Sequence, residues 1–449
     1  MNILFTAPAF FPHSFGGGEI YVYRLAGELL KQGHKLKVLT AVKWDKDKKS
    51  NESYEIQNYE HEDIPVISFS RNPDKISYVE KITGHGPILI EILRKIITEE
   101  SPELIHINGM KPALVMLCNE MQMPHVVTAH HTGIVCPAGG LVRHDWFICE
   151  EEINAHNCIP CCCFWKQSKW YVGGLMGRIP RWIYKPLGKK LLARNKLSYI
   201  LRGLITPWLI EESMRQKKIV LEKAQLIIAP SQFMRELLVK GGCNPDKIHV
   251  IPHGVEPIGR IPMEDIKDRP IRFGYIGRID PSKGLHILLE ATEFLRNGSS
   301  CEIHIFGAAR NPWDEEYKKK TIRTYKGKTK IIDHGLIPHE KISEVYAEID
   351  VVIVPSILPE AFGFVVAEAF SAGRPVIAFN SGALAEAVTE GQNGFIIEDN
   401  KSITLAGYMQ AIIDRPEIVI EMSEKIPAVK TIKEYIDDME IIYRKIINC

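Results

Sequence analysis

The sequence predicts an α/β protein made of two doubly wound domains with Rossmann-like parallel sheets. Two observations support this prediction. Short apolar runs alternate with helical stretches along the first half of the chain, and the same alternation begins again in the second half. Strands that alternate with helices favour a parallel sheet with helices on both faces. A length of 449 residues is sufficient for two such domains.

The individual elements follow from apolar periodicity. In the first half, Ile20–Lys31 and Ile88–Thr98 have helical spacing. The strands predicted there are short apolar runs: Ile3–Thr6, Leu36–Ala41, Val66–Phe69, Leu104–Ile107, Val126–Ala129 and Leu226–Ala229. The strands predicted in the second half are Arg272–Ile276, Glu302–Phe306, Ile331–Asp333, Val351–Val354 and Val376–Phe379.

The predicted domain boundary is a stretch near residues 255–270 that prolines and glycines interrupt. It assigns residues 1–255 to an N-terminal domain and residues 256–429 to a C-terminal domain. Residues 136–210 stand out as an insertion rich in cysteine and basic residues. The tail, about residues 430–449, is predicted to be mostly helical.

The composition excludes several classes of protein. A formal net charge of +1 gives no overall attraction to nucleic acid, and 25% charged residues is ordinary for a globular protein. The sequence contains no run of eighteen apolar residues, so no membrane-spanning helix is predicted. The first residues lack the basic region of a signal peptide. The ten cysteines are therefore expected in a reducing cytoplasm.

Two glutamates, Glu360 and Glu368, follow the buried run Val351–Val354. The spacing predicts a loop that carries Glu360 and a helix that starts near Phe362–Gly363 and carries Glu368. Both carboxylates would then lie at the carboxyl end of the strand, where open α/β sheets bind ligands. Free N–H groups at the helix start suit a phosphate or a polar sugar edge. A glutamate pair without these surroundings would more often be solvated surface charge.

Two cations follow the first predicted strand of the second domain. Arg278 and Lys283 stand in Gly-Arg-x-x-x-x-Lys-Gly, at a junction between strand and helix. Gly277 permits close approach of the backbone, and the two cations suit a diphosphate. They would stabilise the negative charge that develops on a leaving nucleoside diphosphate. The alternative is a solvated charge pair.

The N-terminal domain has candidate residues at two strand ends. Gly16, Gly17 and Gly18 precede a helix and would expose N–H groups to a phosphate or to the reacting sugar. The dinucleotide fingerprint is absent, which argues against a nicotinamide-binding domain. His130 follows another strand in Thr-Ala-His-His. An isolated histidine is more often structural, but this edge favours contact with a donor sugar or an acceptor.

Together these stretches resemble retaining glycosyltransferases of the GT-B fold, of the glycosyltransferase family 4 (glycosyl transferases group 1) type. The resemblance rests on Pro-Ser, Glu-x-Phe-Gly, a second Glu followed by Ala, and Gly-x-Pro-Val-Ile between residues 355 and 377, and on the Gly-Arg and Lys-Gly pairs before them. It implies two domains that face a central cleft, with the last helix crossing back to the first domain. It also implies catalysis without a metal.

The resemblance assigns roles to individual residues. Glu360 would meet the donor sugar and Glu368 the nucleotide ribose, with Arg278 and Lys283 on the diphosphate. His130 matches the sugar-contacting histidine of the family. The remaining donor-binding residues would be Gly16, Gly17, Gly18, Gly277, Phe362, Gly363 and Phe364. His131 departs from the usual aspartate, and Ile251–Glu256 resembles a segment that is mainly architectural, with His253 a weak site candidate.

Six of the ten cysteines fall between Cys136 and Cys163. Thiolates at this spacing could hold a structural zinc ion, and an iron–sulfur cluster is a further alternative. Buried reduced thiols that pack a loop are the competing interpretation. The candidate ligands are Cys136, Cys149, Cys158 and Cys161.

The segment 153–210 contains ten Lys or Arg and no Asp or Glu, with aromatic residues between them. Such a mixture fits a segment on an anionic membrane surface. A solvated helix face is the plain alternative, and no nucleic-acid recognition motif accompanies the basic residues.

The sequence therefore predicts a glycosyltransferase that moves a sugar from a UDP- or GDP-linked donor to an acceptor with retention of configuration. The acceptor is expected to be lipid-linked, in the synthesis of a cell-surface polysaccharide or glycolipid, with the protein peripheral on the inner face of the cell membrane. Two alternatives are a catalytically silent GT-B partner in a polysaccharide assembly complex and a nucleotide-sugar epimerase of GT-B shape. The donor-side residues argue against a catalytically silent partner. An epimerase would differ from a glycosyltransferase in needing no acceptor.

Overall fold

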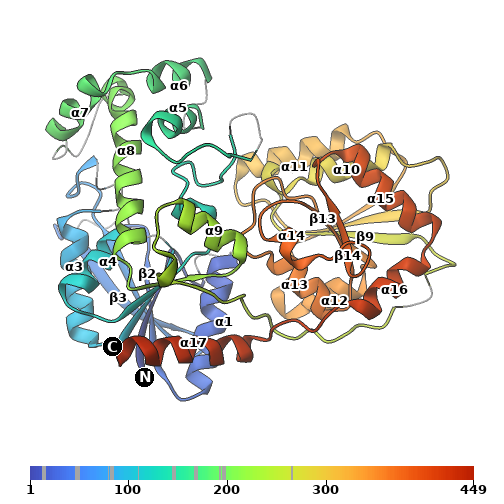
Figure 1. The fold of residues 1–449 in the computed structure, drawn as a ribbon, viewed down its shortest axis with the longest axis horizontal. Coiled ribbons are helices and arrows are strands. Elements are labelled where there is room, and N and C mark those ends of the chain that lie inside the picture. Colours follow the sequence, from blue (N-terminus) through green and yellow to red (C-terminus); the bar gives the residue numbers. More distant parts are fainter. Residues whose placement is uncertain are drawn as a thin grey trace. The chain divides into compact units, whose positions relative to one another are not determined.

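The computed structural model describes residues 1–12, 17–45, 51–78, 80, 85–109, 111–143, 148–165, 170–191, 194, 199–263 and 266–448. The chain divides into two compact units. The N-terminal unit holds Met1–Pro252 and Ile432–Cys449, and the C-terminal unit holds His253–Thr431. Each unit is a mainly parallel sheet with helices on both faces (Figure 1). The predicted α/β class with two Rossmann-like domains is confirmed.

The sheet of the N-terminal unit has the strand order β3-β4-β2-β1-β5-β6-β7-β8 in the described part of the chain. Only the β3–β4 pair is antiparallel among its pairings. Sequence analysis missed β3, a half-exposed edge strand with many polar residues, and β8, which is three residues long. The strands are β1 Asn2–Ala7, β2 Lys35–Ala41, β3 Tyr54–His61, β4 Ile64–Arg71, β5 Leu104–Asn108, β6 His125–Thr128, β7 Leu226–Ala229 and β8 Ile248–Val250.

Helices cover this sheet because their apolar residues recur at helical spacing and can be buried on one side. The two predicted helices correspond to α1 and α3. The helices around the sheet are α1 Gly17–Lys31, α3 Pro87–Glu100, α4 Pro112–Glu120, η1 Thr132–Ile134, α9 Gln232–Lys240, η2 Pro245–Lys247 and α17 Ile432–Ile447.

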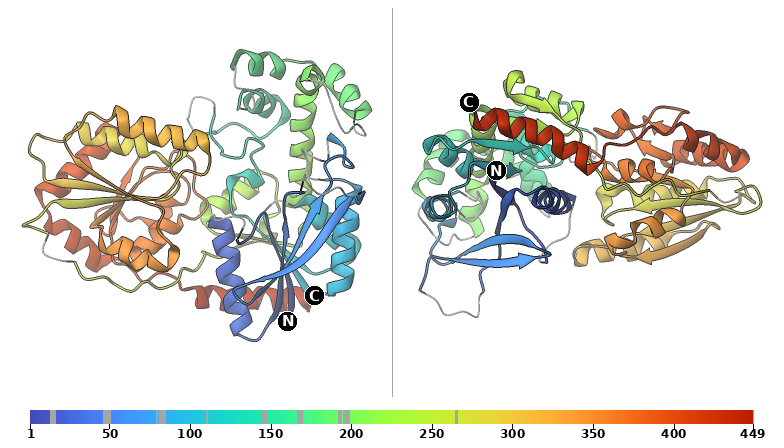
Figure 2. Two further views of the ribbon diagram at one scale, coloured as in Figure 1. Left: turned by 180° about the vertical axis from the view of Figure 1, so that it is seen from behind. Right: turned by 90° about the horizontal axis from the view of Figure 1, so that it is seen from below.

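The last helix, α17, belongs to the N-terminal unit although the whole C-terminal unit precedes it in sequence. It packs against α1 (Figure 2). The buried hydroxyl groups of Tyr435 and Tyr21 lie 2.7 Å apart, and the Tyr443 hydroxyl lies 2.6 Å from Nδ1 of His106 on β5. Two tyrosines of α17 thus contact the polar interior of the first domain.

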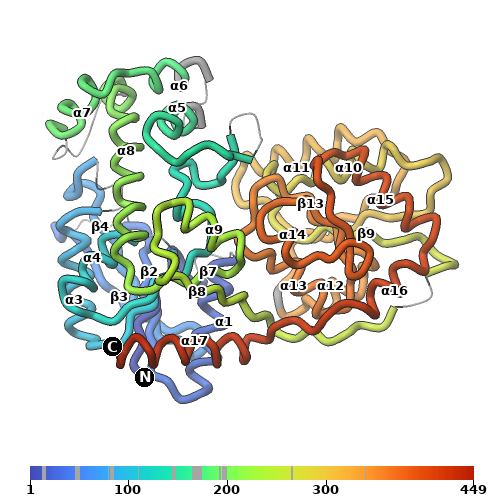
Figure 3. The backbone as a smooth tube through the Cα atoms, viewed as in Figure 1, coloured from blue at the N-terminus to red at the C-terminus, as the bar shows by residue number. Residues whose placement is uncertain are grey.

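In its described residues the insertion contains four helices, α5 Ala155–Trp165, α6 Trp170–Gly177, α7 Arg181–Lys190 and α8 Tyr199–Lys223. The first three gather around one part of α8, which then continues to α4 (Figure 3). They enclose a small core of their own, whose buried members include Ile159, Cys163, Tyr184 and Trp208. The insertion is therefore a packed helical subdomain attached to the sheet through α8.

The sheet of the C-terminal unit has the order β11-β10-β9-β12-β13-β14 and is parallel throughout. Neighbouring residues of β12 contribute alternately to two apolar cores, one on each face. The strands are β9 Ile271–Ile276, β10 Cys301–Phe306, β11 Lys330–Gly335, β12 Val351–Val354, β13 Val376–Phe379 and β14 Gly394–Ile397. The sequence did not indicate β14, which begins with glycine.

The helices of this unit alternate with the strands, as predicted. They are η3 Pro281–Lys283, α10 Leu285–Glu293, α11 Pro312–Thr324, η4 His339–Lys341, α12 Ile342–Ala347, α13 Phe364–Ser371, α14 Leu384–Ala387, α15 Ser402–Asp414 and α16 Glu417–Lys425.

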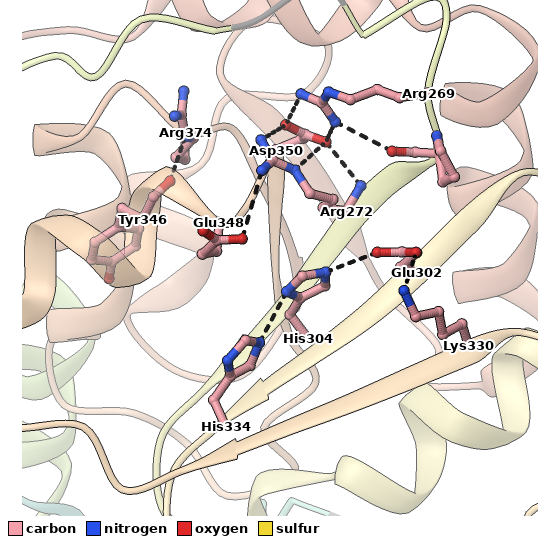
Figure 4. A network of polar contacts seen from close by, with 11 residues as sticks. Arg269, Arg272, Glu302, His304, Lys330, His334, Tyr346, Glu348, Asp350 and Arg374 are labelled. Carbon is pink, nitrogen blue, oxygen red and sulfur yellow. Dashed lines mark hydrogen bonds and ion pairs between the residues drawn. The ribbon is translucent and has the colours of Figure 1, made fainter.

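A buried ionic cluster joins the starts of β9 and β12 (Figure 4). The Asp350 carboxylate accepts hydrogen bonds from Arg269 at 2.7 Å and from the backbone N–H of Arg272 at 2.8 Å. Burial alone would raise the pKa of Asp350, but these hydrogen bonds hold it below its ordinary value. This cluster lies at the amino-terminal edge of the sheet, which leaves the carboxyl edge to the candidate residues.

Candidate functional site

The loop after β12 holds Glu360 in a fixed position. Its backbone N–H donates to Ser381 at 3.1 Å, and its carbonyl accepts from the N–H of Ala383 at 2.9 Å. The helix α13 then starts at Phe364, one residue past the predicted start near Phe362–Gly363. Gly363 caps it with a φ of 88°, and a Cβ there would lie 2.7 Å from a Leu384 methyl group. Glycine is thus required on both conformational and steric grounds.

The Glu360 carboxylate pairs directly with Lys283. Its Oε1 accepts from Lys283 Nζ and, at 3.0 Å, from the Ser356 hydroxyl. The two paired side chains are about a quarter exposed, at 24% and 23%. The two loops meet closely, since a Cβ on Gly284 would lie 2.0 Å from the carbonyl oxygen of Pro355. The structure therefore brings together a cation and a carboxylate that the sequence assigned separately.

Arg278 lies beside this pair in sequence, in the loop that leaves β9. Its guanidinium is 3.5 Å from the Asp280 carboxylate and its side chain is 44% exposed. The Tyr275 hydroxyl donates to the carbonyl of Arg278 at 2.6 Å and holds the turn. Arg278 is therefore held by its backbone while its charged end stays accessible to a ligand.

Gly277 and Gly307 meet where the loops after β9 and β10 run together. Gly277 has a φ of 145°, which only glycine adopts readily. A Cβ on Gly307 would lie 1.8 Å from the carbonyl oxygen of Gly277. Sequence analysis identified Gly277 but missed Gly307, whose partner is 30 residues away in sequence and is set by the pairing of β9 with β10.

Glu368 lies on α13, just past its first turn, and is partly buried. The two phenylalanines that precede it in the motif form an aromatic cluster with His253. The His253 ring stacks on Phe364 at 5.3 Å and meets Phe362 edge-on at 5.2 Å. These contacts give both phenylalanines, and the buried His253, an architectural role in the loop that leads to α13.

In the N-terminal unit, Gly17 and Gly18 form the first residues of α1, and Gly16 lies outside the described residues. A Cβ on Gly18 would meet nothing within 4 Å. Packing therefore does not explain glycine at this position, which leaves room for a ligand as the reason. The roles of these glycines in donor binding stay predictions.

His130 follows β6 and is held from two sides. Its Nε2 lies 2.7 Å from Oδ1 of Asn108, at the end of β5, and its ring meets the Tyr21 ring edge-on at 4.5 Å. Because an amide oxygen can only accept, Nε2 carries the hydrogen of the neutral ring. Burial, with a smaller effect from His131, lowers the pKa of His130 to about 3. His130 is thus a neutral, oriented imidazole.

Asn108 is a residue that sequence analysis missed. It is 1% exposed, and its side-chain nitrogen is buried without a hydrogen-bond partner among the described residues. Its backbone N–H donates to the Thr6 hydroxyl at 3.1 Å. A buried amide donor without a partner is costly, so this nitrogen is a candidate contact for a bound ligand.

The four candidate metal ligands Cys136, Cys149, Cys158 and Cys161 all line one cavity of about 470 Å³ in the insertion. Burial, followed by the neighbouring thiols, raises the pKa of Cys158 to about 11. Within the described ranges, no group of three His, Cys, Asp or Glu side chains is placed to hold a metal ion. The thiols are therefore gathered but not arranged as a metal site, and metal binding stays a prediction.

The basic segment is only partly a solvated face. Tyr184 is buried, and Arg181 pairs with Glu211. Leu175, Trp182 and Ile200, in contrast, are 73%, 77% and 74% exposed. Across the described helices, none is both long and apolar enough to cross a membrane. Contact with a membrane surface is not shown and stays a prediction.

Comparison with known proteins identifies both units. The family described as Glycosyltransferase Family 4 matches residues 15–257, and the one described as Glycosyl transferases group 1 matches residues 261–428. A glycogen synthase of Mycobacterium tuberculosis is 23% identical over 93% of this chain and 87% of its own length. A lipopolysaccharide 1,2-N-acetylglucosaminetransferase of Salmonella typhimurium is 31% identical over 39% of this chain, and the match spans about half of that relative, 49%.

Solved structures match over the full length. The HepE protein of Anabaena, solved in complex with UDP, covers 99% of this chain and 100% of its own, with a TM-score of 0.65 and 18% identity. A sucrose-phosphate synthase of Thermosynechococcus elongatus covers 100% and 99%, with a TM-score of 0.67 and 18% identity. At this level of identity the likeness establishes the fold, which is GT-B.

Proposed function

The chain belongs to glycosyltransferase family 4, and on that premise we propose that it transfers a sugar from a UDP- or GDP-linked donor to a lipid-linked acceptor. The family makes it a retaining glycosyltransferase. The proposed product is part of a cell-surface polysaccharide or glycolipid. The observation that carries the proposal is the Lys283–Glu360 pair at the carboxyl edge of the second sheet, with Arg278 in the loop beside it.

The donor-side residues suit the charges of a nucleotide-sugar. Lys283 and Arg278 would bind the diphosphate and stabilise the charge that accumulates on it as the sugar leaves. Glu360, freed from Lys283, would accept hydrogen bonds from hydroxyl groups of the sugar. Glu368 would accept from the ribose hydroxyl groups, next to the first turn of α13, whose N–H groups favour an anion.

Retention of configuration fits a front-side displacement, in which the acceptor hydroxyl attacks the anomeric carbon on the same face from which the diphosphate departs. A leaving phosphate oxygen takes the proton of that hydroxyl, so the protein need not supply a base. Within the N-terminal unit, the neutral His130 can hydrogen-bond a hydroxyl group without adding charge. The protein's contribution is then positioning and charge stabilisation.

The insertion supports a lipid-linked acceptor. Leu175, Trp182 and Ile200 expose large apolar surfaces on the same helical subdomain that carries the basic residues. Exposed apolar side chains among cations suit the interface of an anionic membrane. The UDP bound to HepE and the lipopolysaccharide named for the Salmonella relative lend support to the donor and to the acceptor class.

The test is the release of nucleoside diphosphate from a panel of UDP- and GDP-sugars, with and without a lipid extract of cell membranes as the acceptor. Release that depends on one donor and rises with the extract supports the proposal. An epimerase would convert the donor without an acceptor, and a silent binding partner would release nothing with any donor. Glu360→Gln, which is expected to lower turnover, serves as the matched control.

A further inference from the structure

A second cavity lies in the N-terminal unit, at the carboxyl ends of β1, β2, β4 and β5. Its volume is about 240 Å³. Pockets that bind whole small molecules are commonly about 300–1,000 Å³, so this one fits a single group of a larger ligand. Its lining is mostly apolar and carries two cations, and it includes Thr6, Leu39, Phe69, Arg71, Leu93 and Lys111.

The two cations differ in what neutralises them. Arg71 forms an ion pair with the buried Glu80 at 3.0 Å, so a fixed carboxylate balances its charge. No carboxylate of the described residues pairs with Lys111, which precedes α4. Lys111 is only partly buried, and this burial lowers the pKa of its ammonium group to about 8. Among the described residues, no carboxylate balances the positive charge that Lys111 brings to the cavity at neutral pH.

The cavity also adjoins the candidate sugar-binding residues. Thr6 lines it, and the Thr6 hydroxyl accepts the backbone N–H of Asn108, whose side chain holds His130. The start of α4 lies at the same place, since Pro112 and Leu114 also line the cavity. An anion there would meet Lys111 and the positive end of a helix dipole.

We infer that this cavity binds the acceptor through an anionic group, a phosphate or a carboxylate, that pairs with Lys111. The inference rests on the proposed glycosyl transfer and adds the chemical class of the acceptor. A lipid diphosphate and a soluble sugar phosphate both supply such a group. The apolar walls then contact the carbon skeleton next to the anion. Asn108 connects the cavity to His130, since it hydrogen-bonds both His130 and Thr6 of the cavity wall.

The first experiment labels lysines in the intact protein with pyridoxal 5′-phosphate and borohydride. The aldehyde condenses with a neutral amine, and reduction fixes the product. Lys111 is expected to react fastest near pH 8, because more of it is neutral than of an ordinary lysine, and sulfate should protect it. Protection should fade as the pH rises through about 8, since only protonated Lys111 pairs with sulfate while Arg71 stays balanced by Glu80. Labelling spread over exposed lysines such as Lys35, without protection by sulfate, would overturn the inference.

Two protecting ligands distinguish the sources of the anion. Farnesyl diphosphate in detergent represents a lipid-linked acceptor, and glucose 1-phosphate represents a soluble one. Protection at lower concentration by farnesyl diphosphate assigns the cavity to a lipid diphosphate, and the reverse order assigns it to a soluble sugar phosphate. Protection by neither at millimolar concentration contradicts an acceptor subsite.

Variants separate this inference from the proposed function. In a Lys283→Met background, which weakens the anion site of the C-terminal unit, Lys111→Met should reduce the rise in Tm caused by sulfate to the part that comes from exclusion of the salt from the protein surface. Lys111→Arg should keep the rise in Tm, because the site needs a positive charge and arginine supplies one. Lys35→Met, at the opposite end of β2, is the control. Lys111→Met alone should bind UDP with unchanged affinity. If no nucleotide-sugar binds while sulfate still protects Lys111, the proposed function fails but the anion site stands. If Lys111→Met keeps the full effect of sulfate, the anion site fails.

Discussion

Lys283 and Glu360 form an ion pair although 77 residues separate them in the sequence. The carboxylate therefore occupies one hydrogen-bonding position of Lys283 that a diphosphate oxygen could take, and the ammonium occupies one position of Glu360 that a sugar hydroxyl could take. We expect donor binding to exchange this pair for two new contacts. At about one-quarter exposure the pair is accessible to such an exchange.

The two glutamates of the motif should respond differently to conversion to glutamine. Glu360→Gln removes the competitor of the diphosphate for Lys283, so the affinity for UDP or GDP should stay equal or rise while turnover falls at least about tenfold. Glu368→Gln should weaken nucleotide binding about tenfold, because one charge-assisted hydrogen bond is worth roughly 1.5–3 kcal/mol. Titration of nucleotides and steady-state kinetics check both. Two variants with parental binding and turnover would reduce the motif to a structural role, and Glu386→Gln, on the nearby α14, is the control.

The buried, neutral His130 should contribute to the pH dependence of the free energy of unfolding. Its folded pKa of about 3 lies below the ordinary 6.5, so the unfolded chain binds the extra proton between these values. The free energy of unfolding should therefore fall as the pH drops from 6.5 toward 4. In His130→Gln that loss should be smaller, as measured by urea denaturation at several pH values. Equal slopes in both proteins would show that His130 is not held neutral, and His61→Gln, half-exposed on β3, is the comparison.

The cysteine cavity should bind one thiolate-held metal ion if its thiols rearrange modestly around it. A cation would reverse the mutual repulsion that helps to raise the pKa of Cys158. Untagged protein should then contain about one equivalent of zinc or iron, and Cys158→Ser should lose it together with part of its thermal stability. Cys301→Ala, in the other unit, should keep the metal. A metal-free parent of normal stability would favour packed thiols.

The insertion should bind anionic membranes through its exposed apolar residues as well as its cations. Each cation near the surface contributes about 1 kcal/mol, and salt should weaken the attachment. Trp182→Ala should reduce co-sedimentation with anionic vesicles without changing Tm, since Trp182 is 77% exposed. Trp313 is similarly exposed, at 81%, but lies in the C-terminal unit, so Trp313→Ala should bind as the parent does. Equal binding by both variants would leave the insertion without a role at the membrane.

The sequence predicted those features that depend on the residues of one segment alone. The strands that position Glu360, Arg278 and His130 are short, mainly apolar runs, and their boundaries were predicted within one residue. Relationships between segments were not available in this way. The Lys283–Glu360 pair depends on Gly284 packing against Pro355, and Asn108 is identifiable only once its amide is seen to be buried. Lys111 belongs to no motif, because its desolvation depends on several strands meeting at one edge of the sheet.

The central claim, a nucleoside diphosphate site built on Lys283 and Arg278, is tested most directly by calorimetric titration of UDP and GDP. The parent should bind one of them, and Lys283→Met and Arg278→Ala should each weaken that binding about ten- to a hundredfold, which corresponds to roughly 1.5–3 kcal/mol. Lys267→Met, whose exposed partner is Glu417, should bind as the parent does. A parent protein that binds neither nucleotide, or variants that bind as tightly as the parent, would contradict the account.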